Sequence, residues 1–530
     1  MIRMHRRAIS AAVILGALAP ATAGAAPVAW TGVPSANPKV AGTSFDNRLS
    51  PELTESAVAR GAMPLDGASS AIPYFGYDAF TAPTVLTQST DEAHKTEPDK
   101  NTYLKLARGQ AGPDPSYDYG THFVYQGHES GPGYITRVNL DADEQHRVTL
   151  LATTDENGTN LPAFDGSTWD PWAQRLLLTA ELGSNGGVWA ATLGYPSHVT
   201  DISGALGRGG YEGIQNDSAG NLVIVEDSGG TTGSTAAGLN HARQPNSFVY
   251  RFLPTTPSDL SRGKLQVLQV ISARTGQPIT FHTGQADADI KSDDTLDLHT
   301  YGHELRTRWV TIHDTANDGT TPFGANALAK AKGGTPFKRP ENGQFVPGSN
   351  FKSFVFDETG DTNLLTEAGS DYGGFGTVQK LTQSSPTANT GTIRVVYQSD
   401  PAHAGFDNVT FVDQHHAAFV EDAGDTLHTQ RNALDSGYLL DVTADYSKAS
   451  TPAPTRFLAE GRDPSATFDA EHTTGNDGDN EITGIHASDG DPSIGGILGA
   501  KTPSLFQNGW RLFWTQQHGD NNLWEVTPSR

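Results

Sequence analysis

The chain of 530 residues contains no cysteine, and this absence removes several chemistries at once. Disulfides, thiolate zinc sites, cysteine nucleophiles and iron–sulfur clusters are all excluded. Basic residues are also scarce, with 36 Lys and Arg against 60 Asp and Glu and a net charge of −24. So negative a surface repels phosphate backbones, so we expect no nucleic-acid partner.

Long helical patterns and long apolar runs are missing as well. The 58 Gly and 31 Pro interrupt the chain often, which argues against helical bundles and coiled coils. Beyond the N-terminus no window approaches the roughly 18 apolar residues of a membrane span, so no stable membrane insertion is expected. The chain also lacks the H-E-x-x-H, Walker A and G-x-S-x-G motifs and a strand-linked G-x-G-x-x-G.

Residues 1–25 have the pattern of a cleaved secretory signal. A basic start precedes the apolar run 8–18, and Ala23-Gly24-Ala25 fits a small-residue cleavage site. The pair Arg6-Arg7 is compatible either with a twin-arginine signal or with an ordinary basic leader. We therefore expect a secreted or otherwise extracytoplasmic protein.

The remaining chain divides into an N-terminal segment and a strand-rich domain. Residues 26–119 are rich in Pro, Ser and Thr and are interpreted as an N-terminal arm together with the first propeller segments. Residues 120–530 carry short apolar or alternating runs separated by Gly, Asn and Asp, which predict strands. The only helical windows that we assign are 51–60 and 325–332.

A strand-and-turn unit recurs along this domain. RLLLTAELG begins at residue 175, NLVIVEDSG at 221, HAAFVEDAG at 416 and RLFWTQQHG at 511. Widely separated strands that end alike are typical of a radial array of sheets. The sequence thus predicts an all-β fold, a β-propeller with insertions, in preference to a β-sandwich.

The ends of these strands carry the candidate metal ligands. Stacking the repeats aligns Glu181, Asp227, Asp422 and Gln517 in one column and places Glu421 in the column before it. Carboxylates that converge on one axis repel one another unless a cation joins them, and oxygen ligands suit hard ions such as Ca²⁺, Mg²⁺, Mn²⁺ or ferric iron. The alternative is that each acid caps its own turn. Acids in similar settings are Glu129, Glu212, Glu341 and Asp407.

The unit Arg339-Pro340-Glu341 points to a different task. Proline stiffens the link between the two charged residues, and a guanidinium fork suits two phosphate oxygens. Arg339 is therefore a candidate for binding substrate phosphate, and a surface ion pair is the alternative.

These motifs resemble the secreted PhoX-type alkaline phosphatases. The matching segments, in order, are LLLTAE, GYEGIQNDSAGNLVIVED, NSFVYRFLP, KRPENGQF, FDNVTFVDQHHAAFVEDAGD and TQQHG. The resemblance implies a six-bladed propeller with ferric iron and calcium at its axis, and export by the twin-arginine route. It further implies iron-site carboxylates at Glu212 and Glu341, calcium-side ligands at Asp227, Asp407 and Glu421, and substrate binding by Arg339.

The chain departs from the family at one ligand. Ala180 stands where the family has an iron-binding cysteine, next to Glu181. A methyl group cannot hold ferric iron, whereas the carboxylates can still bind Ca²⁺, Mn²⁺ or Mg²⁺. We expect calcium, and the second metal stays open among iron, manganese and magnesium.

The resulting hypothesis is a secreted, metal-dependent phosphatase that acts on small phosphorylated substrates as a monomer. Two alternatives remain at this stage. One is a calcium-dependent lactonase or phosphotriesterase on the same scaffold, because fold alone does not fix the reaction. The other is a non-catalytic secreted propeller that calcium stabilises.

Overall fold

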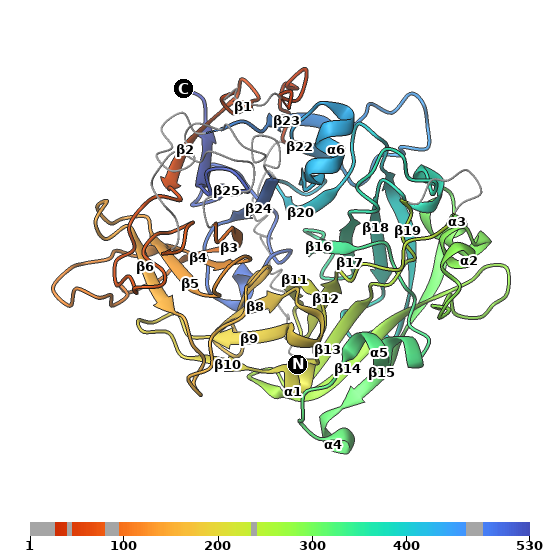
Figure 1. Cartoon of the computed structure of the whole chain (residues 1–530), viewed down its shortest axis with the longest axis horizontal. Helices are drawn as coiled ribbons and strands as arrows, with labels where there is room; N and C mark the ends of the chain where they lie inside the picture. Colours follow the sequence, from red (N-terminus) through yellow and green to blue (C-terminus); the bar gives the residue numbers. More distant parts are fainter. Residues whose placement is uncertain (1–26, 40–44, 80–94, 235–240, 463–480) are drawn as a thin grey trace, which may run out of the picture.

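The computed structural model describes residues 27–39, 45–79, 95–234, 241–462 and 481–530. It shows an all-β protein whose sheets are arranged like the blades of a propeller around a central axis (Figure 1). This confirms the predicted fold class. The predicted signal sequence 1–25 lies outside the described residues.

Most of the sheets are four-stranded antiparallel meanders. The first contains β3 (Pro98–Lys105), β4 (His122–His128), β5 (Ile135–Asn139) and β6 (Val148–Ala152). The next contains β7 (Ser167–Asp170), β8 (Arg175–Ala180), β9 (Gly187–Ala191) and β10 (Val199–Asp201).

A nine-stranded sheet follows, formed by two meanders that share β15 (Leu305–Asp314). One meander contains β11 (Tyr211–Asn216), β12 (Leu222–Glu226), β13 (Val249–Thr256) and β14 (Asp259–Ile271). The other contains β16 (Pro340–Phe345), β17 (Ser353–Glu358), β18 (Thr377–Gln383) and β19 (Thr390–Gln398). Because β15 hydrogen-bonds to both β14 and β19, the hydrogen bonding does not separate these meanders into two sheets.

N-terminal strands complete the last two sheets. β1 (Arg48–Leu49) joins β20 (Phe406–Phe411), β21 (His416–Glu421), β22 (Ser436–Asp441) and β23 (Thr455–Ala459). β2 (Leu53–Ala59) joins β24 (Glu481–Ser488), β25 (Arg511–Gln517) and β26 (Leu523–Pro528). Segments from the two ends of the chain thus share a sheet, which closes the ring. The predicted segment boundary at residue 120 falls between β3 and β4 of one sheet.

Short helices occupy the connections. They are α1 (Ser203–Leu206), α2 (Ala286–Ile290), α3 (Asp293–His299), α4 (Thr315–Asp318), α5 (Ala325–Ala331) and α6 (Gly424–Arg431). The predicted helix at 325–332 is confirmed as α5. Among the described residues, no helix is both long and apolar enough to cross a membrane.

The helix predicted over residues 51–60 is wrong, because this segment forms β2. Leu53 and Ala57 pack against the apolar core, while Thr54 and Ser56 are exposed. This alternation has the period of two that a strand at the edge of a sheet requires. Pairing with β26 therefore decides the conformation.

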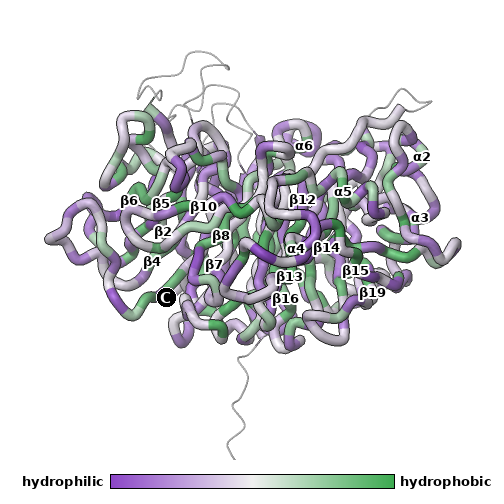
Figure 2. The backbone as a smooth tube through the Cα atoms, turned by 90° about the horizontal axis from the view of Figure 1, so that it is seen from below, coloured by the Kyte–Doolittle hydropathy of each residue, from purple (hydrophilic) through white to green (hydrophobic). Residues whose placement is uncertain are grey.

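The repeated strands predicted from the sequence are β8, β12, β21 and β25, and each is the second strand of its meander. The innermost strands are β3, β7, β11, β16, β20 and β24, which contact one another in this cyclic order around the axis. Apolar side chains fill the space between neighbouring sheets, as where Tyr125 on β4 packs with Leu178 on β8. Seen from the side, hydrophobic segments run through the body and hydrophilic segments are frequent in the outer turns (Figure 2).

Close packing at the axis generates a first prediction. A Cβ added to Gly213 of β11 would lie 2.8 Å from the Asn342 side-chain oxygen and 2.9 Å from the Asn342 Cα on β16. We expect Gly213→Ala to lower the free energy of unfolding by about 1–3 kcal/mol, because it forces two inner strands apart. Gly194→Ala is the control, since no atom lies within 4 Å of that added Cβ. Equal Tm values for the two variants in thermal unfolding would contradict the packing argument.

Candidate metal centre

Acidic residues stand at the beginning of the inner strands. In β3, β11, β16 and β20 the second residue is acidic: Asp99, Glu212, Glu341 and Asp407. In β24 the first residue is Glu481, and Asp165 lies two positions before β7. All of these acids are buried. In β3, β11, β16 and β20 the acid lies within a shift of the strand register. A bulge of this kind re-aims a side chain, and here it recurs at the same position of successive sheets.

A second set of acids directly follows the second strand of several meanders. Its members are Glu129 after β4, Glu181 after β8, Asp227 after β12 and Asp422 after β21. The start of an inner strand and the end of its antiparallel partner lie at the same edge of a sheet, as the pairing of Tyr211 with Glu226 shows. Both sets therefore meet at one end of the axis, and together we call them the axial acidic cluster.

Two groups within this cluster have the spacing of metal ligands. Oxygen atoms of Asp99, Glu129 and Asp165 lie within 4.8 Å of one another. The same limit holds for Asp165, Glu181 and Glu212, so Asp165 belongs to both groups. A hard cation needs several oxygen ligands from different segments, and this arrangement supplies them.

Burial and mutual repulsion disturb the ionisation of these groups. Burial, reinforced by Asp407, raises the pKa of Asp99 to about 7. Burial and the neighbouring Asp99 raise the pKa of Glu129 to about 8, and burial with Asp227 raises the pKa of Glu181 to about 9. The pKa values of Asp165, Glu212 and Glu341 are raised well above the usual range for the same reasons. Without a cation the cluster therefore holds protons at neutral pH.

Arg339 is a partly exposed cation in contact with the cluster. Its Nε atom donates a hydrogen bond of 2.7 Å to Asp227, and a terminal nitrogen lies 3.5 Å from Glu341. Its side chain is 22% exposed, whereas Asp227 and Glu341 are buried. The backbone of Arg339 has a φ of 60°, a left-handed conformation that non-glycine residues adopt at a cost of about 1–3 kcal/mol.

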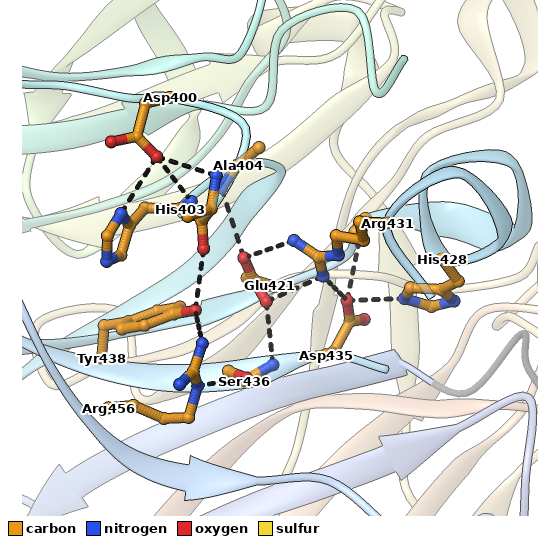
Figure 3. A network of polar contacts seen from close by, with 12 residues as sticks. Asp400, His403, Ala404, Glu421, His428, Arg431, Asp435, Ser436, Tyr438 and Arg456 are labelled. Atoms are coloured by element: carbon orange, nitrogen blue, oxygen red, sulfur yellow. Dashed lines mark hydrogen bonds and ion pairs between the residues drawn. The ribbon is translucent and has the colours of Figure 1, made fainter. Parts of the chain in front are cut away.

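Glu421 belongs to a different polar network, which it forms with Arg431 and its neighbours (Figure 3). Both of its oxygens accept hydrogen bonds of 3.0 Å from Arg431 of α6, and they also accept the backbone N–H groups of Ala404 and Ser436. Four donors thus occupy a carboxylate that the resemblance assigns to calcium. The next residue, Asp422, interacts electrostatically with Asp407 and Glu481 of the axial acidic cluster.

The predicted site residues are therefore placed as follows. Glu181, Glu212, Asp227, Glu341, Asp407, Asp422 and Glu129 meet at the axis with Arg339, and Glu421 pairs with Arg431. Ala180 is fully buried in an apolar cluster. Among the described residues, the candidate ligands of the cluster are carboxylates.

The axial set that the sequence predicts does not include Asp99, Asp165 and Glu481. Asp99 had a usable signal, because Pro98-Asp99-Lys100-Asn101 has the same form as Pro340-Glu341-Asn342-Gly343. Glu481 follows an acidic loop and carries no such motif. The ring nitrogens of His518 lie 2.6 Å from Glu97 and 3.3 Å from Glu481, so this histidine also adjoins the cluster.

Comparison with one solved structure supports this fold. PhoX from Pseudomonas fluorescens, solved in complex with vanadate, a transition state analogue, aligns with a TM-score of 0.53 over 93% of this chain and 98% of that chain, at 11% identity. A nidogen/laminin complex aligns with a TM-score of 0.30 over 71% of this chain and 91% of that chain, at 10% identity. TolB from Acinetobacter baumannii aligns with a TM-score of 0.30 over 82% of this chain and 64% of that chain, at 9% identity. No protein-family model and no curated protein matches the sequence. The similarity to PhoX is therefore one of fold.

Proposed function

We propose that this protein is a secreted, metal-dependent phosphatase that hydrolyses phosphate esters at the axial acidic cluster. The proposal rests on two sets of three acids that share Asp165, each with its ligand oxygens within 4.8 Å of one another. A partly exposed Arg339 lies next to them. The PhoX-like fold supports the proposal. In this interpretation each meander of the nine-stranded sheet is one blade, which makes the propeller six-bladed.

The residues present fit hard cations. Asp99, Glu129, Asp165, Glu181 and Glu212 supply the two close groups, and Asp227, Glu341, Asp407, Asp422 and Glu481 surround them. We propose calcium as one ion and leave iron, manganese or magnesium for a second. Glu421 is left out of this ligand set because Arg431 and two backbone groups already occupy its oxygens.

The chain's own residues would bind and orient the substrate. Asp227 fixes the Arg339 side chain through Nε, which leaves further N–H groups of the guanidinium to donate to phosphate oxygens. Such donors stabilise the charge that develops during phosphoryl transfer. Bound cations would neutralise phosphate charge and activate an oxygen nucleophile. The net charge of −24 does not prevent this, since screening limits its reach to about 8–10 Å.

The remaining parts of the proposal come from the sequence. Residues 1–25 would direct export, and Arg6-Arg7 would use the twin-arginine route, which carries folded protein. The substrate would be a small phosphate ester, and the enzyme a monomer. A lactonase or phosphotriesterase activity at the same centre is distinguished by testing neutral esters.

One observation favours a second function. Ala180, where the resemblance implies a metal-binding cysteine, is buried among apolar side chains. A centre without this ligand could bind calcium only to stabilise the propeller. In that case chelation lowers the Tm strongly, while no metal restores phosphatase activity.

The first test combines metal analysis with an assay. The protein is purified from its secretion route, its metals are measured by mass spectrometry, and hydrolysis of p-nitrophenyl phosphate is followed after each metal is restored. Metal-bound protein that hydrolyses no phosphate ester with calcium, iron, manganese or magnesium would refute the proposed activity.

Replacing Arg339 tests the substrate-binding role. We expect Arg339→Ala to lower kcat/KM for p-nitrophenyl phosphate by about 10–100-fold, because a charged hydrogen-bond donor is worth about 1.5–3 kcal/mol. Metal content should stay unchanged. Arg511→Ala is a matched control, since Arg511 is similarly exposed and pairs with Glu525. Loss of metal from Arg339→Ala would show that its assigned role is wrong.

Two buried glutamates give a direct comparison of ligand and structural roles. Glu341→Gln should reduce the bound metal and weaken the response of the Tm to chelator. Glu421→Gln should leave metal content intact, while disruption of the Arg431 pair destabilises the fold by about 3–5 kcal/mol. Elemental analysis and thermal unfolding of both variants measure these effects. Equal metal contents in the two variants would remove Glu341 from the ligand set.

The raised pKa values predict a characteristic pH dependence. Asp99, Glu129 and Glu181 have folded-state pKa values of about 7, 8 and 9, above the unfolded values of about 4. The metal-free folded state therefore binds more protons, and its stability falls as the pH rises from about 4 to about 9. Cations compete with these protons. We expect the Tm difference between calcium-loaded and chelated protein to widen from about pH 6 to about pH 9, whereas a constant difference would contradict binding at these groups.

A further inference from the structure

One lysine lies inside the axial acidic cluster, far less exposed than Arg339. Lys100 belongs to the inner strand β3, directly after Asp99, and is 2% exposed. Its Nζ atom lies 3.3 Å from the carbonyl oxygen of Ile485 on β24 and 3.5 Å from that of Val409 on β20. Three inner strands therefore enclose one ammonium group.

Carboxylates complete these surroundings. Burial lowers the pKa of Lys100 to about 8, and the charges of Asp407, Asp99 and Asp357 oppose this shift. The Thr483 hydroxyl bridges Asp99 and Asp407, so the two acids are held next to each other. One oxygen of Asp357 accepts the backbone N–H of Asn342 at 2.8 Å, and its other oxygen is buried without a hydrogen-bond partner among the described residues.

Further oxygen donors occupy the corresponding position of other inner strands. Asn342 and Asn408 follow Glu341 and Asp407 just as Lys100 follows Asp99. Both asparagines are at most 1% exposed, and in the part of the chain that the structure describes their side-chain oxygens have no partner. Buried carbonyl, amide and carboxylate oxygens are the donors that calcium prefers in proteins.

We propose that the Lys100 ammonium occupies a cation position of the axial cluster and takes the place of one further metal ion. This inference rests on the proposed binding of metal at the cluster. It adds that the Lys100 ammonium limits the number of metal ions that the cluster can hold. Lys100 is too buried to meet a substrate, so its role is to neutralise charge. Arg339, at 22% exposure, remains the cation available to phosphate.

The charge change in Lys100→Met tests this directly. The variant loses the ammonium group but keeps the apolar length of the side chain, so its oxygen surroundings gain one uncompensated negative charge. We expect calcium-equilibrated Lys100→Met to contain one more Ca²⁺ per chain than the wild type, measured by mass spectrometry of dialysed protein. Its Tm should fall in chelator and recover with added Ca²⁺ further than the wild-type Tm does.

Two controls separate charge from packing. In the double variant Lys100→Met with Asp357→Asn one positive and one negative charge are removed together, so no additional ion is expected. Lys338→Met removes another buried lysine, whose partner Asp361 lies 2.9 Å away, and should also gain no ion. Lys100→Gln is the second variant for the case that Lys100→Met does not accumulate.

The outcomes are distinct. A wild-type protein that binds no metal overturns the proposed function itself. A wild type that binds metal, with Lys100→Met and Lys100→Gln at wild-type metal content, overturns only the role of Lys100. Failure of both variants to fold in Ca²⁺-containing medium also overturns it, because the proposal requires that a metal ion can replace the ammonium.

Discussion

Repulsion between buried carboxylates is the constraint on which the centre of this molecule depends. Asp99, Asp165, Glu212 and Glu341 are each at most 5% exposed, and burial together with neighbouring carboxylates raises the pKa of each of them. A buried charge costs several kcal/mol unless an opposite charge or a ligand compensates it. The basic groups next to the cluster are mainly Arg339, Lys100 and His518, and they are too few to neutralise the negative charge of its acids. A scaffold that holds these acids together therefore needs bound protons or cations to compensate their charge.

The scaffold holds them through the free edges of its inner strands. An inner strand has a hydrogen-bonded neighbour on one side only, so its other edge needs partners from the adjacent sheet. Hydroxyl groups supply several of them: Thr179 donates to the carbonyl of Glu212 at 2.5 Å, and Thr359 to that of Phe406 at 2.8 Å. Each bond ties the backbone at or beside a cluster acid to the neighbouring sheet. The positions of the acids are thus fixed by the contacts that hold the ring together.

The sequence predicted the strands well, because apolar runs that end in acid and glycine recur. It predicted less well which acid faces the axis. Successive strand positions point to opposite sides, so of Glu421 and Asp422 only one can join the cluster. Glu226 and Glu421 turn away to Tyr250 and Arg431, whereas Asp227 and Asp422 interact with the cluster.

The inner-strand acids were harder to find. Glu212, Glu341 and Asp407 have an adjoining motif, but Asp165 precedes a strand of four residues that resembles none of the others. Its place follows only from the ring order, in which β7 lies between β3 and β11. The helix prediction over residues 51–60 failed for a similar reason. This segment becomes a strand by pairing with β26, which lies at the other end of the chain. Information of this kind is tertiary and is absent from local patterns.

Lys100 and Arg339 differ in how deeply they are buried at the centre. Lys100 is enclosed by backbone carbonyls of two other inner strands, so no substrate can compete for its charge. Arg339 is held by Asp227 through one nitrogen and is exposed enough to meet a ligand from solvent. Its strained backbone, with a φ of 60°, keeps the guanidinium next to both Asp227 and Glu341. The proposed phosphate-binding centre would need both an internal cation and an accessible one, because the first lowers the repulsion that the second and its ligand would otherwise have to overcome.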